Sequence, residues 1–364
     1  MNVKSICELI EDVAPLSLQE SYDNAGLLVG NPLMTVDGVL VCIDINEQVI
    51  EEAVNKKCNL IISHHPLIFS GIKQLIGKNE VERCVIAAIK NDIAIYAAHT
   101  NLDNVLDGVN GKIADKLSLL NRSILQPKQN SLLKLVVYVP KLHTFSVREA
   151  LFKAGAGKLG EYDSCSFNVE GLGTFKSNEN ASPFVGQANT FHTEPEVRVE
   201  VILPIYLKNK VLQALLKSHP YEEPAYDFIP VHNSWNEVGG GLIGELEEEV
   251  DEIEFLERLK HTFNQPCIRY TKLLGRKIKR VAICGGSGSS LLSKAIDKRA
   301  DVYISGDFKY HEFFDVQNRI LVADIGHYES EQFTKELFID IISKKMTTFA
   351  VQISDVKTNP INYL

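Results

Sequence analysis

Three stretches of the sequence end an apolar run with side chains that could bind a metal ion. They are His64 and His65 in "ISHHPLIF" (62–69), His99 and Asp103 in "AAHTNLDNVLDGVN" (97–110), and His327 and Glu331 in "ADIGHYESEQF" (323–333). Imidazole and carboxylate groups together, without thiolate, suit Zn, Mn, Fe or Ni. The sequence therefore predicts a site for divalent metal ions with nitrogen and oxygen ligands.

The adjacent pair His64 and His65 is the most specific of these signals. Pro66 favours an extended conformation for His65, and successive residues of an extended chain point to opposite sides. The two imidazoles can therefore diverge from one backbone position and serve two neighbouring ions. Glu331 follows His327 by four residues, a spacing that places both side chains on one face of a helix.

Each of the other ligand candidates also has a structural interpretation when taken alone. His99 could be a hydrogen-bonded core residue or could orient a neighbouring ligand. Asp103 could cap a helix, and His327 could simply begin one. Two buried imidazoles in sequence, however, need polar partners, which favours a shared site.

The candidates must be brought together by the strands that they follow. Residues 60–62 are apolar on both faces, as in a covered parallel strand, and ligands of open α/β folds bind at the carboxyl edge of such a sheet. We expect the three stretches to end strands of one parallel sheet. Groups more than 200 residues apart in the sequence would then converge at its edge.

Three further motifs could carry function. "CGGSGSS" (284–290) could hold an anion on its backbone amides or form a tight strand-to-helix turn. "SGDFKYHEF" (305–313) offers Asp307, Lys309 and His311 as acid, base or substrate-binding groups. "HPYEEPAYD" (219–227) is typical of a structured loop, with a metal site as the alternative.

The order of the expected elements gives the fold class and the domains. Residues 1–126 and 236–364 alternate helix and strand, which indicates two parallel-sheet α/β halves of one core. We expect 348–354 to be the last strand of the second half and 120–131 to be a polar linker. Residues 127–235 have the order β-α-β-β-α-β of an inserted ferredoxin-like α+β domain.

The composition limits the function classes. A formal net charge of −9 makes nucleic acid an unexpected partner, although bound cations could attract a small anionic substrate. Seven scattered cysteines without a C-x-x-C pattern argue against disulfides and against a thiolate zinc site. The N-terminal residues predict a helix and no signal peptide, and no apolar run is long enough to cross a membrane. We expect a cytoplasmic protein.

The motifs together resemble the Nif-three-like dinuclear-metal proteins, also named GTP cyclohydrolase 1 type 2 homologs. The resemblance rests on "YDNAGLLVG" (22–30), the three metal-ligand stretches, "GGSGSS" and "SGDFKYHE". It implies two divalent ions (Zn, Fe or Mn) held by His64, His65, Asp103, His327 and Glu331. It also implies a ring-shaped homohexamer, and an insert like the PII-like, CutA-like domain of the longer bacterial members.

Two functions follow as hypotheses. The first is a metal-dependent hydrolase of a nucleotide or related heterocycle, similar to a GTP cyclohydrolase 1 type 2. In it, His99, Asp307 and His311 are the candidates for proton transfer. The second is a non-catalytic metal-binding or small-ligand-sensing regulatory protein, which the PII-like character of the insert favours.

Overall fold

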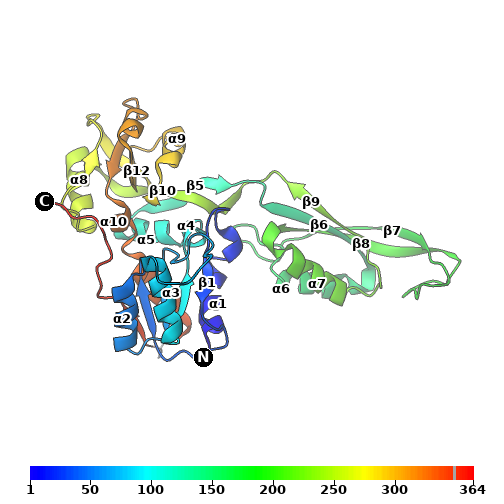
Figure 1. The fold of residues 1–364 in the computed structure, drawn as a ribbon. Coiled ribbons are helices and arrows are strands. Elements are labelled where there is room, and N and C mark those ends of the chain that lie inside the picture. The colour runs from blue at the N-terminus through cyan, green and yellow to red at the C-terminus, as the bar shows by residue number, and fades with distance from the viewer. Residues whose placement is uncertain (347–349) are drawn as a thin grey trace. The chain divides into compact units, whose positions relative to one another are not determined.

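The computed structural model describes residues 1–346 and 350–364 and has two compact units. The first unit comprises Met1–Pro127 and Glu237–Leu364, and the second comprises Lys128–Asn236. Both units mix helices with β-sheets (Figure 1). The predicted α/β class with an inserted α+β segment is confirmed.

The first sheet of the first unit has the strand order β1-β4-β3-β2-β15. Its strands are β1 (Gly26–Val29), β2 (Val39–Cys42), β3 (Leu60–Ser63), β4 (Ala94–Ala97) and β15 (Val351–Ile353). Strands β2, β3, β4 and β15 run parallel, and β1 is antiparallel to β4. Every residue of β2, β3 and β4 is buried, which explains their continuous apolar sequences.

Helices connect these strands. They are α1 (Val3–Val13), α2 (Glu47–Asn55), α3 (Glu80–Lys90), α4 (Thr100–Asp103) and α5 (Val109–Lys116), with a 3-10 turn η1 (Leu16–Leu18) after α1. The side chains of Asn2, Asn46 and Asn79 cap the first three helices by accepting a backbone N–H of the first turn. Such caps satisfy amides that have no partner within the helix.

The second sheet has the order β11-β14-β13-β12-β10-β5. Its strands are β5 (Leu120–Lys128), β10 (Trp235–Asp251), β11 (Arg269–Tyr270), β12 (Lys277–Ser287), β13 (Val302–Gly306) and β14 (Leu321–Asp324). The central strands β12, β13 and β14 are parallel, while β10 and β11 are antiparallel to their neighbours. The connecting elements are α8 (Glu252–Thr262), η4 (Ser289–Leu291), α9 (Leu292–Asp297), η5 (Tyr310–Phe314), α10 (His327–Glu331) and α11 (Thr334–Lys345).

Three expectations about this unit were wrong. The candidate ligands do not follow strands of a single sheet, because β3 and β4 lie in the first sheet and β14 in the second. The predicted linker at 120–131 contains strand β5, which lies at the edge of the second sheet, where Pro127 is tolerated. The predicted last strand pairs with β2 in the first sheet instead of completing the second half, and its residues 348 and 349 lie outside the described residues.

The second unit has the predicted β-α-β-β-α-β order. Its elements are β6 (Leu132–Pro140), η2 (Lys141–His143), α6 (Thr144–Lys153), β7 (Phe167–Lys176), β8 (Phe191–Pro204), η3 (Ile205–Leu207), α7 (Lys208–Ser218) and β9 (Tyr226–Val231). The antiparallel sheet has the order β7-β8-β6-β9, with α6 and α7 against it (Figure 1). The finer likeness to PII-like and CutA-like domains stays a prediction.

Removing the second unit should leave a folded first unit. Strands β5 and β10, which lead into and out of it, are hydrogen-bonded neighbours, so a short Asn-Gly turn can replace residues 128–236. We expect a cooperative thermal transition and the metal content of the full chain, measured by circular dichroism and elemental analysis. Aggregated protein with no bound metal would show that the second unit is needed for the fold of the first.

Across the described residues, no helix is both long and apolar enough to cross a membrane.

Candidate metal centre

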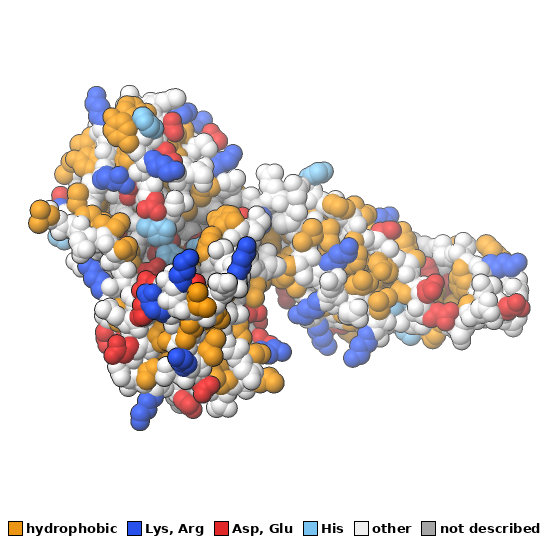
Figure 2. All heavy atoms as spheres, in the orientation of Figure 1, with side chains coloured by type: hydrophobic (Ala, Val, Ile, Leu, Met, Phe, Trp, Pro, Cys, Tyr) orange, Lys and Arg blue, Asp and Glu red, His pale blue; other side chains and the backbone are white. Residues whose placement is uncertain are grey.

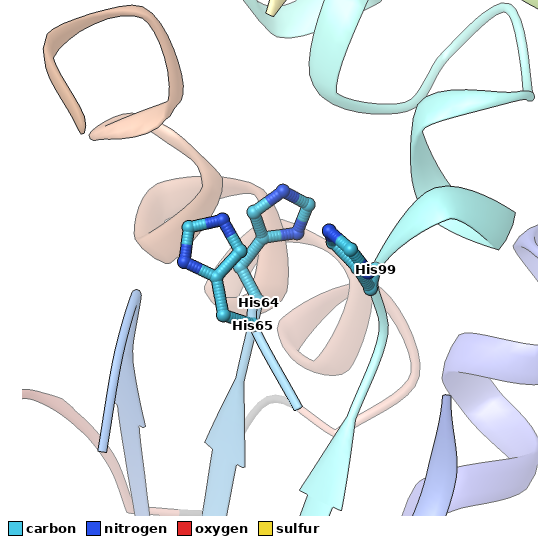
Figure 3. Close-up of side chains that lie close together, drawn as sticks. All are labelled: His64, His65 and His99. Carbon is cyan, nitrogen blue, oxygen red and sulfur yellow. The ribbon is translucent and has the colours of Figure 1, made fainter. Parts of the chain in front are cut away.

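Four histidine rings lie side by side where the carboxyl ends of the two sheets of the first unit meet. His64 and His65 directly follow β3, and His99 follows β4 (Figure 3). The ring centroids of His64 and His65 are 5.0 Å apart, and the His99 ring is 5.3 Å from each. From the second sheet, His327 brings its ring to 5.2 Å from that of His65. Histidine and carboxylate side chains gather in a hollow on the face that Figure 2 shows.

The Nδ1 atom of each ring has its own acceptor. The partners are Ala98 O for His64 (2.9 Å), Asp44 Oδ1 for His65 (2.6 Å), Asp23 Oδ1 for His99 (2.8 Å) and Asp307 Oδ2 for His327 (2.7 Å). A carbonyl or carboxylate oxygen can only accept, so each Nδ1 carries the proton. The Nε2 lone pair is thereby made available, as in histidines that bind metal ions.

Two carboxylates complete the cluster. Oε1 of Glu331 lies 3.5 Å from Nε2 of His64, and its Oε2 lies 3.1 Å from Nε2 of His65 and 3.2 Å from Nε2 of His327. Oδ1 of Asp103 lies 3.7 Å from Nε2 of His64. Glu331 therefore presents one oxygen to His64 and the other to the His65 and His327 pair.

Two glycines make room for this carboxylate and its helix. A Cβ on Gly286 would lie 2.3 Å from Oε1 of Glu331, and the residue has φ +63°, which favours glycine. Gly326, with φ +89°, precedes α10, and a Cβ there would also clash with a side chain of that helix. Part of the motif 284–290 thus serves to place α10 against β12.

The electrostatics favour a positive charge in the middle of the cluster. Burial alone would raise the pKa of Glu331, but His64, His327 and His65 hold that pKa well below its usual range. Burial opposes protonation of His65 and His327, yet the neighbouring carboxylates raise their pKa to about 10 and about 9. Burial raises the pKa of Asp103, against the opposing effect of His64.

The residues present fit a bound cation. Nε2 of His64, Oδ1 of Asp103 and Oε2 of Glu331 are buried and have no hydrogen-bond partner. Buried polar atoms are rarely left without a partner. Two groups of three residues have ligand atoms within 4.8 Å of one another and share Glu331: His64 with Asp103, and His65 with His327. A third such group joins His64, His65 and His99.

The nearby thiol is not part of the ligand set. Burial, together with the charges of Asp103 and Glu331, raises the pKa of Cys284 to about 12. Cys284 also belongs to none of the three groups whose ligand atoms lie close together. The cluster therefore offers nitrogen and oxygen ligands, which suit Zn, Fe or Mn.

The three candidates for proton transfer lie in different places in the structure. His99 joins the cluster as a further imidazole, and Asp307 orients His327 through Nδ1. His311 lies on the exposed turn η5, with its ring against Tyr310 and Phe314. A role for His311 in proton transfer stays a prediction.

Sequence reasoning missed two carboxylates, Asp23 and Asp44, that orient His99 and His65. Asp44 follows β2 by two residues, so the strand-end argument that found the histidines could also have found it. Asp23 lies in the loop before β1 and also accepts the backbone N–H of Thr100. No local pattern points from residue 23 to residue 99.

The glycine-rich motif is a packed turn. The amides of Gly285, Gly286 and Gly288 donate to Asn110 Oδ1, Ser330 Oγ and Ser305 Oγ, each at 2.9 Å. Those N–H groups are therefore occupied by side chains of this chain. Of the two interpretations, the geometry favours the strand-to-helix turn over an anion site.

Comparison with known proteins places these features in context. The family model described as Duf34/NIF3 (NGG1p interacting factor 3) matches residues 1–360. A "GTP cyclohydrolase 1 type 2 homolog" from Halalkalibacterium halodurans is 39% identical over 368 residues, covering 100% of this chain and 99% of the relative. The crystal structure of a Bacillus cereus protein related to NIF3 matches with a TM-score of 0.85 at 36% identity, over 100% of this chain and 99% of that one. A Staphylococcus aureus crystal structure matches with a TM-score of 0.79 at 31% identity and the same coverage.

Proposed function

This chain belongs to the Duf34/NIF3 family, and from that membership and the cluster geometry we propose that it is a dinuclear metal-dependent hydrolase. Its substrate is a nucleotide or a related heterocycle. The observation that carries the proposal is the position of Glu331, whose two oxygens face different histidines. A carboxylate can serve two ions, whereas an imidazole has one nitrogen to offer.

Each ion has a ligand set within the cluster. His64 Nε2, Asp103 Oδ1 and Glu331 Oε1 would hold the first ion, and His65 Nε2, His327 Nε2 and Glu331 Oε2 the second. Divalent ions at such a site supply Lewis-acid activation of water and neutralise developing negative charge. They would also offset the net charge of −9 in attracting an anionic nucleotide.

His99 is the residue that we assign to proton transfer. Asp23 accepts a hydrogen bond from Nδ1–H of His99. Nε2 of His99 therefore has a free lone pair beside His64 and His65. Burial acts against ionisation of Asp23, but His99 and Thr100 hold the pKa of Asp23 at about 2. The carboxylate therefore stays ionised and steadies the imidazolium that forms when Nε2 takes up a proton.

One observation favours the alternative, a small-ligand sensor. The second unit contains a cavity of about 630 Å³ whose walls include Phe175, Phe184 and Tyr221. A volume of this size is typical of small-molecule sites. The loop 219–227 forms part of the cavity, and both ring nitrogens of His219 are used in hydrogen bonds to Tyr138 O and Tyr221 N. That geometry favours a structured loop over a metal site there.

Turnover separates the two functions. We expect metal-loaded protein, incubated with a panel of nucleotides and related heterocycles, to give a hydrolysis product by mass spectrometry. His64→Ala should abolish product formation and lower the amount of bound metal, because His64 is fully buried within the cluster.

The matched control is His261→Ala, at an exposed position of α8, which should behave as wild type. A ligand that raises the melting temperature without any product would favour the sensor. Equal turnover in His64→Ala and wild type would contradict the hydrolase at this site.

A further inference from the structure

The last eleven residues form an extended tail that reaches both halves of the metal centre. After β15, the backbone N–H of Ser354 donates to Val41 O, and the side chain of Ser354 donates to Glu52 on α2. Beyond this point the tail has no regular secondary structure. The backbone N–H of Asp355 also donates to Glu52. Further along the tail, two adjacent side chains make the contacts that lead to the cluster.

Thr358 contacts the carboxylate that orients His65. Its Oγ1 donates to Oδ2 of Asp44 at 2.8 Å, while Oδ1 of Asp44 accepts Nδ1–H of His65 at 2.6 Å. The two bonds occupy different oxygens and so fix the rotation of the carboxylate. Without the hydroxyl, Asp44 could turn about its side-chain torsions, and the His65 ring would lose a fixed direction.

Asn359 contacts the helix that carries the other ligands. Its Nδ2 donates to Oε1 of Glu329 at 2.7 Å, and Glu329 lies in the middle of α10, between His327 and Glu331. The Glu329 side chain is buried and its second oxygen has no hydrogen-bond partner. Asn359 is therefore an important partner of a buried carboxylate on the ligand helix.

We propose that Thr358 and Asn359 are positioning residues that clamp the ligand group His65, His327 and Glu331. The group needs a histidine from the first sheet and a helix from the second. Thr358 contacts Asp44, which orients that histidine, and Asn359 contacts Glu329 on that helix. The inference rests on the metal-binding part of the proposed function and adds a role for a segment that contains none of the ligands.

The exposure of the tail supports this role. Thr358 and Asn359 are half-buried, whereas Lys357 and residues 360–364 are exposed. Val356, which packs on the core beside the first sheet, is also half-buried. Within residues 357–364, Thr358 and Asn359 are therefore the covered residues. A tail held only for general stability would not need hydrogen-bonding side chains at these two successive positions.

The test is a Zn²⁺ titration of the full chain against a chromophoric chelator. Thr358→Val removes the hydroxyl and keeps the shape, and Asn359→Ala removes the amide. Each should raise the dissociation constant of one ion by about tenfold, the lower end of the effect of losing a residue behind a ligand. The other ion should be affected less, because it shares only Glu331 with this group and its His64 is anchored by a backbone carbonyl.

Two controls separate positioning from general stability. Thr358→Ser keeps the hydroxyl and should restore wild-type affinity, and Asn362→Ala changes an exposed tail residue and should have no effect. The visible spectrum of the Co²⁺-loaded protein provides a second readout, since a disordered His65 changes the ligand field.

The possible outcomes are distinct. Variants that melt earlier without metal but bind both ions as tightly as wild type would overturn the clamp and leave the metal centre intact. A wild-type chain that binds no Zn²⁺ would overturn the metal centre and the clamp together.

Discussion

Glu331→Gln should lower metal occupancy from about two ions per chain toward one and weaken binding by at least about a hundredfold. Both oxygens of Glu331 face imidazole nitrogens, at 3.5, 3.1 and 3.2 Å. An amide offers one weaker acceptor and no charge, so it cannot bridge two ions. Two cations at close range would then be less screened from each other. Any hydrolysis should fall more steeply than occupancy, because it needs both ions.

The measurement is metal stoichiometry at matched free-metal concentration. His65→Ala is the comparison and should weaken mainly one ion, since His65 belongs to the group with His327. Glu257→Gln, at an exposed residue of α8, is the matched control for the same chemical change. Full double occupancy with unchanged affinity in Glu331→Gln would remove Glu331 from the ligand set.

Without metal, the protein should lose stability as the pH rises from about 6.5 to about 10. In the folded state the pKa of His65 is about 10 and that of His327 about 9, above the ordinary value of 6.5. The folded chain therefore keeps protons that the unfolded chain releases. Their stabilisation is fully present below pH 6.5 and disappears as the pH passes the folded-state values. We expect a loss of several kcal/mol.

Urea unfolding of chelator-treated protein at several pH values measures this loss. His65→Gln removes one of the two groups and should flatten the profile. Metal-loaded protein should show the opposite trend in affinity, with tighter binding at higher pH, because a bound ion requires unprotonated Nε2. Identical profiles for His65→Gln and wild type would contradict the assignment of these protons to the cluster.

The sequence located the cluster of candidate ligands better than it predicted the sheets that hold it. Buried strands such as β3 and β4 are continuous apolar runs, and the polar residues after them stand out. Strand β5 contains Asn121, Arg122 and Gln126 and lies at an edge, so its sequence is typical of a linker. Sheet membership depends on pairings between distant strands, such as β15 with β2, and no local pattern encodes those.

The same limit applies within the site. The family resemblance placed five candidate ligands, and the structure brings all five together. His99 and Asp307 were predicted only as candidates for proton transfer, because the role of each depends on which atom its side chain contacts. Asp44 was missed although it follows the end of β2, as the histidines follow their strands. Asp23 and the contact of the C-terminal tail with Asp44 were missed because no spacing rule connects residues so far apart in the sequence.

The wide separation of the ligands along the chain has a consequence for biosynthesis. His65 and His327 are 262 residues apart, which corresponds to roughly 13 to 50 s of translation at about 5–20 residues per second. For that time the emerging chain presents His64, His65 and His99 without Glu331 or the last strand of the first sheet. A nascent chain therefore has an incomplete set of ligands, and the full centre can be loaded only after Glu331 has been synthesised.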